Sequence, residues 1–256
     1  MFSNIIEIII LSIVQGISEF LPISSSAHLN IVEIIFEFNS NSLMIDVSLH
    51  LGSLIAIVFY FRRELLDLRN NQKLLSLLII GSIPIVIAGY IISSTGLVNL
   101  LENNLKIIAW TTLIFGIFLY LADKSKFDKK ISSNLNFKTI LYIGLFQILA
   151  LIPGVSRAGI TITAARLFRF NRFDSSKISF LLAIPAIAGA SVLQLKNAIG
   201  QNFEFNYLIL ISITLSFLFS YFTVKFFLDY INKFSLNIFV IYRIIISIIL
   251  FIIIYN

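Results

Sequence analysis

Residues 139–165 read TILYIGLFQILALIPGVSRAGITITAA, an apolar stretch that is interrupted at Pro153-Gly154 and carries one charge, Arg157. Each half of this stretch has about 14 residues, or ~21 Å of helix, whereas the hydrocarbon core of a bilayer is about 30 Å thick. Neither half can cross a membrane alone. The stretch is therefore expected to enter and leave on one face, as a re-entrant hairpin whose tip lies at Pro153-Gly154.

The composition of the whole chain indicates a membrane protein. Hydrophobic residues make up 58% of the 256 residues and charged residues 12%, whereas about a quarter of an average soluble domain is charged. Long apolar runs recur from end to end, which excludes a soluble enzyme, a disordered chain and a nucleic-acid-binding module. Since the chain has no Cys, disulfides, thiolate catalysis and Cys-bound metals are excluded as well.

Basic residues fall into four clusters that predict the topology. In chain order these are Arg62, Arg63, Arg69 and Lys73; Lys124, Lys126, Lys129, Lys130 and Lys138; Arg166, Arg169, Arg172 and Lys177; and Lys225 with Lys233. The stretches between them that are long enough to cross a membrane are 43–61, 76–95, 107–121, 178–195, 207–228 and 238–254. Because cytoplasmic loops are rich in Lys and Arg, we place all four clusters in the cytoplasm and predict six transmembrane spans. The broken stretch 139–165 then begins and ends on the cytoplasmic side, as its length requires.

A second broken stretch covers residues 4–37 and is interrupted at Pro22. No basic residue precedes Arg62, so this hairpin is expected to open from the outside. Its residues from Gln15 to His28 resemble those from Gln147 to Gly159, and three spans follow each hairpin. The two halves would therefore have opposite orientations in the membrane.

The fold predicted is all-α: a polytopic membrane protein with six transmembrane helices and two re-entrant helical hairpins in an inverted-topology repeat. Residues 1–256 form a single membrane domain, with repeat 1 at about 1–121, a cytoplasmic loop at 122–138 and repeat 2 at about 139–256. Such repeats place a binding site near the bilayer midplane, where the two broken helices meet.

Polar residues gather at both predicted tips. Ser24, Ser25, Ser26 and His28 follow the first proline, and Gly154, Ser156, Arg157 and Thr161 follow the second. A serine just beyond a proline break is a good N-cap for the half-helix after it. Both half-helices would then point backbone N–H groups and positive dipole ends at the midplane, which favours an anion.

Arg157 requires a partner at this depth. An uncompensated arginine there costs about 3 kcal/mol on insertion scales, so a buried carboxylate or a bound anion is expected. The repeat brings Glu19 to the same place, and we expect room between the two groups for a diphosphate. A guanidinium binds phosphate oxygens bidentately, which suits phosphoryl transfer on an amphiphile with a phosphate head. A purely structural Arg157–Glu19 ion pair, with serines that only cap and pack helices, is the alternative.

At these residues the sequence resembles the bacitracin-resistance family of undecaprenyl-diphosphate phosphatases. The family's first motif corresponds to Gln15 to Glu19, then Phe-Leu-Pro-Ile-Ser-Ser at 20–25 and His28, and its second to Pro-Gly-Val-Ser-Arg-Ala-Gly-Ile-Thr at 153–161. The resemblance covers essentially the whole chain. Gln15 stands where many members have Glu, and Ala158 replaces the usual Ser.

The resemblance implies hydrolysis of undecaprenyl diphosphate to undecaprenyl phosphate and phosphate, which recycles the lipid carrier of peptidoglycan synthesis and gives bacitracin resistance. It implies the bacterial cytoplasmic membrane, with the site open to the extracytoplasmic side. It also implies a divalent cation, Mg or Ca, with Glu19 as a candidate ligand, although Gln15 weakens a two-carboxylate metal site. The expected partners are the polyprenyl diphosphate and the lipid bilayer, with no nucleic acid; a homodimer is left open.

For the chemistry, we expect Ser25 to attack the terminal phosphorus while Glu19 or His28 takes its proton and Arg157 holds the phosphate. The residues expected to bind substrate are Gln15, Ser24, Ser26, Gly154, Ser156 and Thr161. The rival mechanism uses a water nucleophile oriented by Glu19 and a metal. The rival functions are a lipid-phosphate flippase or anion transporter using the same site, and a structural scaffold.

Overall fold

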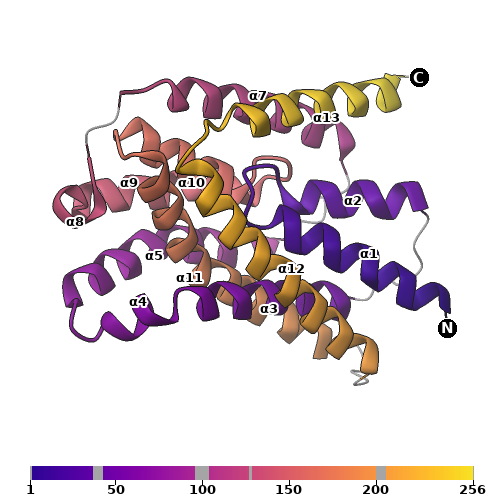
Figure 1. The fold of residues 1–256 in the computed structure, drawn as a ribbon. Coiled ribbons are helices and arrows are strands. Elements are labelled where there is room, and N and C mark those ends of the chain that lie inside the picture. The colour runs from indigo at the N-terminus through magenta and orange to yellow at the C-terminus, as the bar shows by residue number, and fades with distance from the viewer. Residues whose placement is uncertain (1, 37–42, 96–103, 127–128, 200–205, 256) are drawn as a thin grey trace.

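The computed structural model describes residues 2–36, 43–95, 104–126, 129–199 and 206–255; residue 37, the expected end of the first broken stretch, lies outside these ranges. Helices form nearly all of the described structure (Figure 1). They are α1 Phe2–Ser18, α2 Ser25–Phe36, α3 Leu43–Tyr60, α4 Arg62–Asp67, α5 Gln72–Thr95, α7 Leu105–Asp123, α8 Ile131–Asn134, α9 Phe137–Gln147, the 3-10 helix η1 Ile148–Leu151, α10 Arg157–Leu167, α11 Arg172–Ile199, α12 Tyr207–Ile231 and α13 Asn237–Tyr255.

Among the described residues, six helices are long and apolar enough to cross a membrane: α3, α5, α7, α11, α12 and α13. They coincide with the six predicted spans, so within the described ranges the prediction of an all-α protein with six helices suited to crossing a membrane is confirmed. The predicted bounds differ most at the starts of α5 and α11, which begin at Gln72 and Arg172. Both helices gain a polar first turn, because helical hydrogen bonds continue beyond the apolar segment that hydropathy detects.

Each broken stretch consists of two short helices joined at the predicted proline. Residues 19–24 connect α1 to α2, and residues 152–156 connect η1 to α10. In both connections the last residue before the second helix is a serine with positive φ, +78° at Ser24 and +70° at Ser156. L-residues other than glycine rarely adopt a positive φ, so this geometry is unfavourable. The two tips have it at the same position, directly before the second helix.

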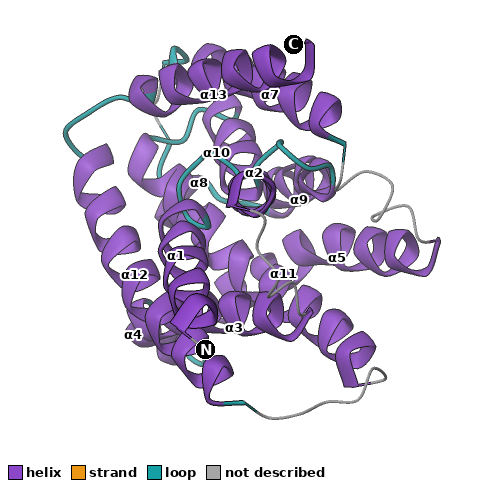
Figure 2. Ribbon diagram, turned by 90° about the vertical axis from the view of Figure 1, so that its right-hand side faces the viewer, coloured by secondary structure: helices purple, strands orange, loops and turns teal. Residues whose placement is uncertain are grey.

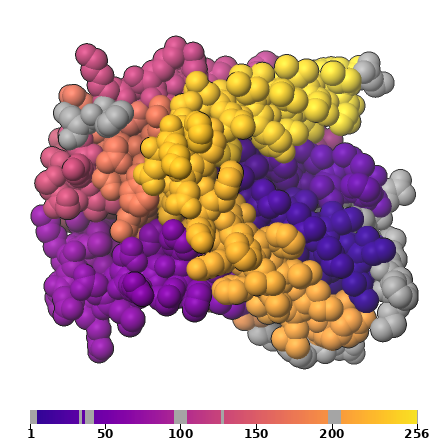
Figure 3. All heavy atoms as spheres, viewed as in Figure 1, coloured from indigo at the N-terminus to yellow at the C-terminus, as the bar shows by residue number. Residues whose placement is uncertain are grey.

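Helices of the first half pack on helices of the second. α3 contacts α11, α7 contacts α13, α1 contacts α12, and α9 contacts α5. Figure 1 shows α7 beside α13, and it shows α1 beginning and α13 ending at the end of the bundle opposite α4 and α8. In the space-filling view α12 runs diagonally across the face of the molecule between α1 and α3 (Figure 3). The core therefore lies between the two halves of the chain.

Arg243, on α13, joins the two tips. Its side chain is fully buried, at 0% exposure. Nη1 donates to the carbonyl oxygens of Pro22, at 3.2 Å, and Val155, at 3.0 Å. Nη2 donates to the Gly154 carbonyl at 2.9 Å, and Nε donates to the Thr112 carbonyl on α7 at 3.0 Å. No carboxylate of the described residues pairs with this guanidinium, so backbone carbonyl dipoles stabilise its charge.

Arg243→Met should destabilise the protein by about 3–5 kcal/mol, because the buried carbonyls of both tips lose their donors. Thermal unfolding in detergent measures the effect. Arg63→Met, at an exposed position on α4, is the control and should leave the midpoint unchanged. Arg243→Lys should recover only part of the loss, because one ammonium cannot reach the carbonyls of both tips. An unchanged midpoint for Arg243→Met would contradict the role given to this side chain.

Candidate active site

Glu19 is the point at which the polar side chains of the two tips meet. Arg157 Nη2 donates to Glu19 Oε1 at 3.1 Å. Ser25 Oγ donates to Glu19 Oε2 at 2.7 Å, and Gln15 Nε2 donates to the same oxygen at 3.1 Å. The side chains of Arg157 and Glu19 are only 12% and 8% exposed. One largely buried carboxylate therefore contacts an arginine, a serine hydroxyl and an amide.

The local structure explains why these groups converge. Glu19 directly follows α1, one helical turn after Gln15, whereas Ser25 and Arg157 are the first residues of α2 and α10. Ser156 caps α10 because its Oγ accepts from the Gly159 N–H at 3.1 Å, which confirms the predicted N-cap at the second tip. The two helices thus begin beside the same carboxylate.

At the first tip the serines are arranged differently. Ser24 occupies the position before α2, and its Oγ lies 3.4 Å from Ser26 Oγ. Ser26 is exposed, whereas Ser24 is buried. The structure therefore brings Ser25 alone of the three into contact with Glu19 among the described hydrogen bonds.

Helix α11 also contacts Arg157. Its Nη1 donates to the Ser179 carbonyl at 3.3 Å. Thr161 is fully buried, and its hydroxyl is hydrogen-bonded to the Arg157 carbonyl and to Ser179 Oγ, both at 2.7 Å. The hydroxyl of Thr161 points at these protein groups, and its role in binding substrate stays a prediction. Its contacts fix the start of α10 and so the position of the guanidinium.

The predicted gap between Arg157 and Glu19 is absent, because the two groups are in direct contact. In this arrangement the Glu19 carboxylate accepts from the Arg157 guanidinium where a phosphate oxygen of the substrate would have to accept. An anion would have to draw the N–H donors of Arg157 away from Glu19. Such an exchange is electrostatically balanced when Glu19 becomes protonated, since the carboxyl group then loses its charge.

His28 is bound at both ring nitrogens. Nδ1 lies 2.6 Å from the Ser24 carbonyl oxygen, and Nε2 lies 2.6 Å from the Tyr242 hydroxyl. The two rings stack at 5.5 Å with planes 10° apart. Because a carbonyl only accepts, Nδ1 carries the proton and Nε2 accepts from Tyr242. His28 is therefore not hydrogen-bonded to Ser25, and of the two bases predicted for that serine, Glu19 is the one in contact with it.

Tyr242 is a residue that sequence reasoning missed. Its signal was its place in the closing Ile-Tyr-Arg segment, next to Arg243. The two neighbours on α13 act on the first tip together, since Tyr242 binds His28 while Arg243 binds the Pro22 carbonyl.

Gly154 is required by close packing against α7. Its φ is +86°, and a Cβ there would collide with Thr111 Oγ1. Thr111 also donates to the Pro153 carbonyl at 2.6 Å, and the Gly154 carbonyl accepts from Arg243. Gly154 therefore allows the second tip to pack closely against α7.

The residues of the site fit a divalent cation poorly. No group of three or more His, Asp or Glu side chains within the described ranges could hold a metal ion. Glu19 Oε1 is occupied by Arg157 and Oε2 by Ser25 and Gln15, and Gln15 supplies an amide instead of a second carboxylate. A hard cation prefers several oxygen ligands, so we derive no step through such an ion.

Comparison with known proteins gives a consistent result. The family described as "Bacitracin resistance protein BacA" matches residues 8–249. A protein of Pelagibacter ubique (strain HTCC1062) named undecaprenyl-diphosphatase is 97% identical over 256 residues, which is 100% of both chains. Proteins named undecaprenyl-diphosphatase from Elusimicrobium minutum (strain Pei191) and undecaprenyl-diphosphatase 1 from Pseudoalteromonas translucida (strain TAC 125) are 39% and 38% identical, each over 96% of this chain and 97% of their own length.

Tyr242→Phe should leave His28 Nε2 without its donor while keeping the ring stack. The chain has two histidines, so His50→Gln leaves His28 as the one imidazole signal in a nitrogen-15 NMR spectrum. In that background we expect a protonated Nδ1 and an accepting Nε2. Adding Tyr242→Phe should move the Nε2 resonance towards that of an unbonded imidazole nitrogen. Tyr230→Phe is the control, and identical spectra for the two tyrosine variants would contradict the assignment.

Proposed function

Because the chain belongs to the bacitracin resistance protein BacA family, we propose that this multi-pass membrane protein is an undecaprenyl-diphosphatase, which hydrolyses undecaprenyl diphosphate to undecaprenyl phosphate and phosphate. The observation that carries the proposal is the contact of both Ser25 and Arg157 with the carboxylate of Glu19. A nucleophile, a base and a cation for the phosphate are thereby adjacent. Removing undecaprenyl diphosphate, which bacitracin sequesters, accounts for resistance and returns the lipid carrier to peptidoglycan synthesis.

The reaction proceeds in two steps. Ser25 Oγ attacks the terminal phosphorus while Glu19 Oε2, 2.7 Å away, accepts its proton. The bond from this phosphorus to the bridging oxygen breaks, and undecaprenyl phosphate leaves. Water then attacks the phosphoserine, Glu19 returns its proton to Ser25 Oγ as the bond from phosphorus to Oγ breaks, and both protons of the water leave on the phosphate.

Arg157 changes partner during the first step. Before the reaction it neutralises Glu19, and once Glu19 is protonated the guanidinium is attracted to the phosphoryl oxygens instead. The N-termini of α2 and α10, which begin at Ser25 and Arg157, add backbone N–H groups and positive dipole ends at the same place. Stabilising charge that develops on a phosphoryl group is the main requirement of this chemistry.

The packing supports an inverted-topology repeat with two re-entrant hairpins. Equivalent positions in the two halves lie 132 residues apart: Gln15 and Gln147, Ser24 and Ser156, and the first residues of the 19-residue helices α7 and α13. A twofold axis would pair α3 with α11 and α7 with α13, and would exchange the α1–α12 contact for α9–α5. These are the contacts that the chain makes.

Ion pairs support the cytoplasmic placement of all four basic clusters. Asp123, at the end of α7, accepts from Arg172 at 2.8 and 3.0 Å and from the Leu236 N–H at 3.2 Å. Lys177 pairs with Glu64 on α4 at 3.2 Å. The segments that carry the four clusters therefore meet at one end of the bundle, with residues 122–138 as the loop between the repeats. The site then opens to the extracytoplasmic side of the bacterial cytoplasmic membrane. The homodimer stays a prediction.

Arg157→Lys should lower phosphate release from undecaprenyl diphosphate by about a hundredfold or more, because a point charge cannot replace the two-pronged guanidinium. The purified Arg157→Lys variant is assayed in detergent beside wild type and beside Arg63→Lys, a control at an exposed position. Near-normal turnover in Arg157→Lys would reject the phosphate role. If the protein is instead a flippase or transporter, wild type will move labelled lipid between the leaflets of vesicles and will release no phosphate.

A phosphoserine should form at Ser25 during turnover. Rapid acid quenching with a substrate labelled in its terminal phosphate, followed by mass spectrometry, should locate the label on Ser25 in wild type. Ser26→Ala should retain the label, because Ser26 makes no contact with Glu19 in the described hydrogen bonds. Phosphate release without any labelled serine would favour a water nucleophile instead.

A further inference from the structure

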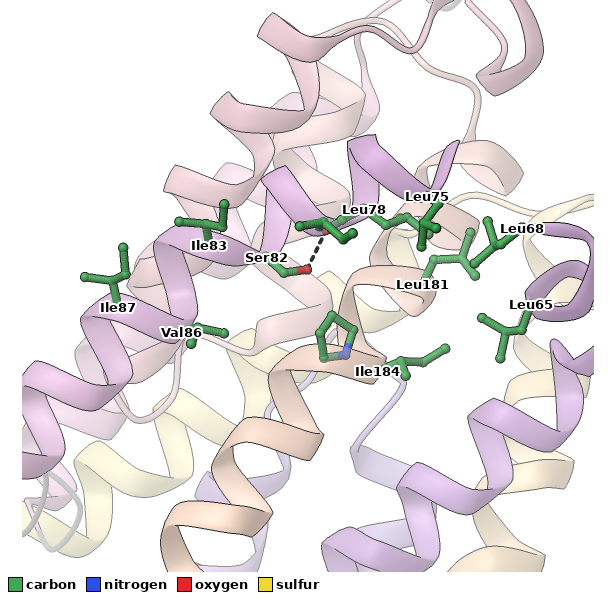
Figure 4. Close-up of a pocket in the computed structure, with 12 residues that line it drawn as sticks. Leu65, Leu68, Leu75, Leu78, Ser82, Ile83, Val86, Ile87, Leu181 and Ile184 are labelled. Carbon is green, nitrogen blue, oxygen red and sulfur yellow. Dashed lines mark hydrogen bonds between the residues drawn. The ribbon is translucent and has the colours of Figure 1, made fainter. Parts of the chain in front are cut away.

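An apolar groove of about 440 Å³ lies between α5 and α11 and is separate from the Glu19 site. One face of α5 forms its longest wall, with Leu75, Leu78, Ser82 and Val86 recurring every three or four residues. Leu181 and the residues one turn further along α11 form the opposite wall, and side chains of α4 and the following turn close one end (Figure 4). No described part of the chain fills the groove between these helix faces.

None of the described side chains that line the groove offers a free hydrogen-bonding group to a ligand. Ser82 is its one hydroxyl-bearing residue, and that Oγ donates to the Leu78 carbonyl of its own helix at 2.7 Å (Figure 4). The other lining side chains are aliphatic or proline. A polar ligand would lose its hydrogen bonds to water without replacement, so the lining selects a hydrocarbon chain.

Of the two walls, α11 also contacts the candidate active site, and α5 packs on the helices before the second tip. On α11, the Ser179 carbonyl accepts from Arg157, and Leu181 in the groove is two residues further, a rise of ~3 Å. On α5, a Cβ at Gly89 would meet the side chain of Leu151, at the second tip, just beyond the last groove residue. The groove therefore lies at the level of the guanidinium along α11, and its α5 wall ends close to Leu151 of the second broken stretch.

The groove is open beyond its described lining. Gly189 lies one turn past Pro185 on the same face of α11, and a Cβ there would meet no atom within 4 Å. Figure 2 shows α5 and α11 diverging towards their C-terminal ends. A long chain could thus enter between these helices and continue past the groove into the bilayer.

We propose that this groove holds part of the isoprenoid chain of the substrate while Arg157 binds the diphosphate head. The proposal rests on the function proposed above, which requires a long, wholly apolar chain beside a buried phosphate site. The groove matches such a chain in polarity, lies level with the guanidinium along α11 and has that helix as one wall. It is a chain-binding subsite that lowers KM without taking part in the chemistry.

Val86→Trp tests the subsite, because Val86 is 48% exposed and an indole there can fill the groove without displacing core side chains. Ile248→Trp on α13, at 51% exposure and outside the lining, is the matched control. Val86→Trp should raise KM for undecaprenyl diphosphate about fivefold, a modest change because the chain would otherwise lie in equally apolar lipid. kcat should not change, and KM for short-chain farnesyl diphosphate should not change.

Three kinetic outcomes would overturn the subsite: an unchanged KM for the long substrate, an equal rise for both substrates, or an equal rise in the control. If wild type releases phosphate from neither substrate, the proposed function fails, and the groove is then tested by binding alone. Undecaprenyl phosphate with a diazirine in its chain should label residues 75–87 or 181–185 of wild type but not of Val86→Trp. Absent labelling, or labelling displaced by phosphatidylglycerol and not by unlabelled undecaprenyl phosphate, would reject the subsite.

Discussion

The positions of all the polar groups at the site depend on the hydrogen bonds that Arg243 donates to backbone carbonyls of both tips. Each tip is irregular backbone between two helices, and its buried carbonyls need hydrogen-bond donors from elsewhere in the protein. One fully buried guanidinium supplies donors to both tips and to α7. Ser25 and Arg157 come next to Glu19 because the backbones that carry them are joined through this side chain.

The two buried arginines, Arg243 and Arg157, differ in the kind of group that accepts their hydrogen bonds. Among the described residues, the partners of Arg243 are backbone carbonyls, which cannot change charge. Arg157 is paired with a carboxylate that can accept a proton, so its contact can be exchanged for one with an anion. A structural cation and an exchangeable cation thus lie near each other, and they differ in the chemistry of their partners.

Much of the architecture follows from local sequence patterns. Six apolar stretches predict the six long helices, and the prolines predict the two breaks, because span length and proline chemistry are local properties. The meeting of Glu19 with Arg157 was predicted from the repeat together with the need of a buried charge for a partner. The pairing of His28 with Tyr242, 214 residues apart, and the carbonyl ligands of Arg243 depend on tertiary packing that no local pattern encodes. The direct contact that replaces the expected gap depends on side-chain distances, which periodicity cannot give.

Within the proposed repeat, Arg243 occupies the position that Thr111 occupies in the first half, 132 residues earlier. Thr111 donates to the Pro153 carbonyl as Arg243 donates to that of Pro22. A dimer of identical half-length chains would have to place the same residue at both positions, and two guanidiniums so close to one another would repel. Fusion of duplicated halves into one polypeptide removes that restriction. An ancestor assembled from separate halves would therefore have needed an uncharged or differently compensated residue near its symmetry axis.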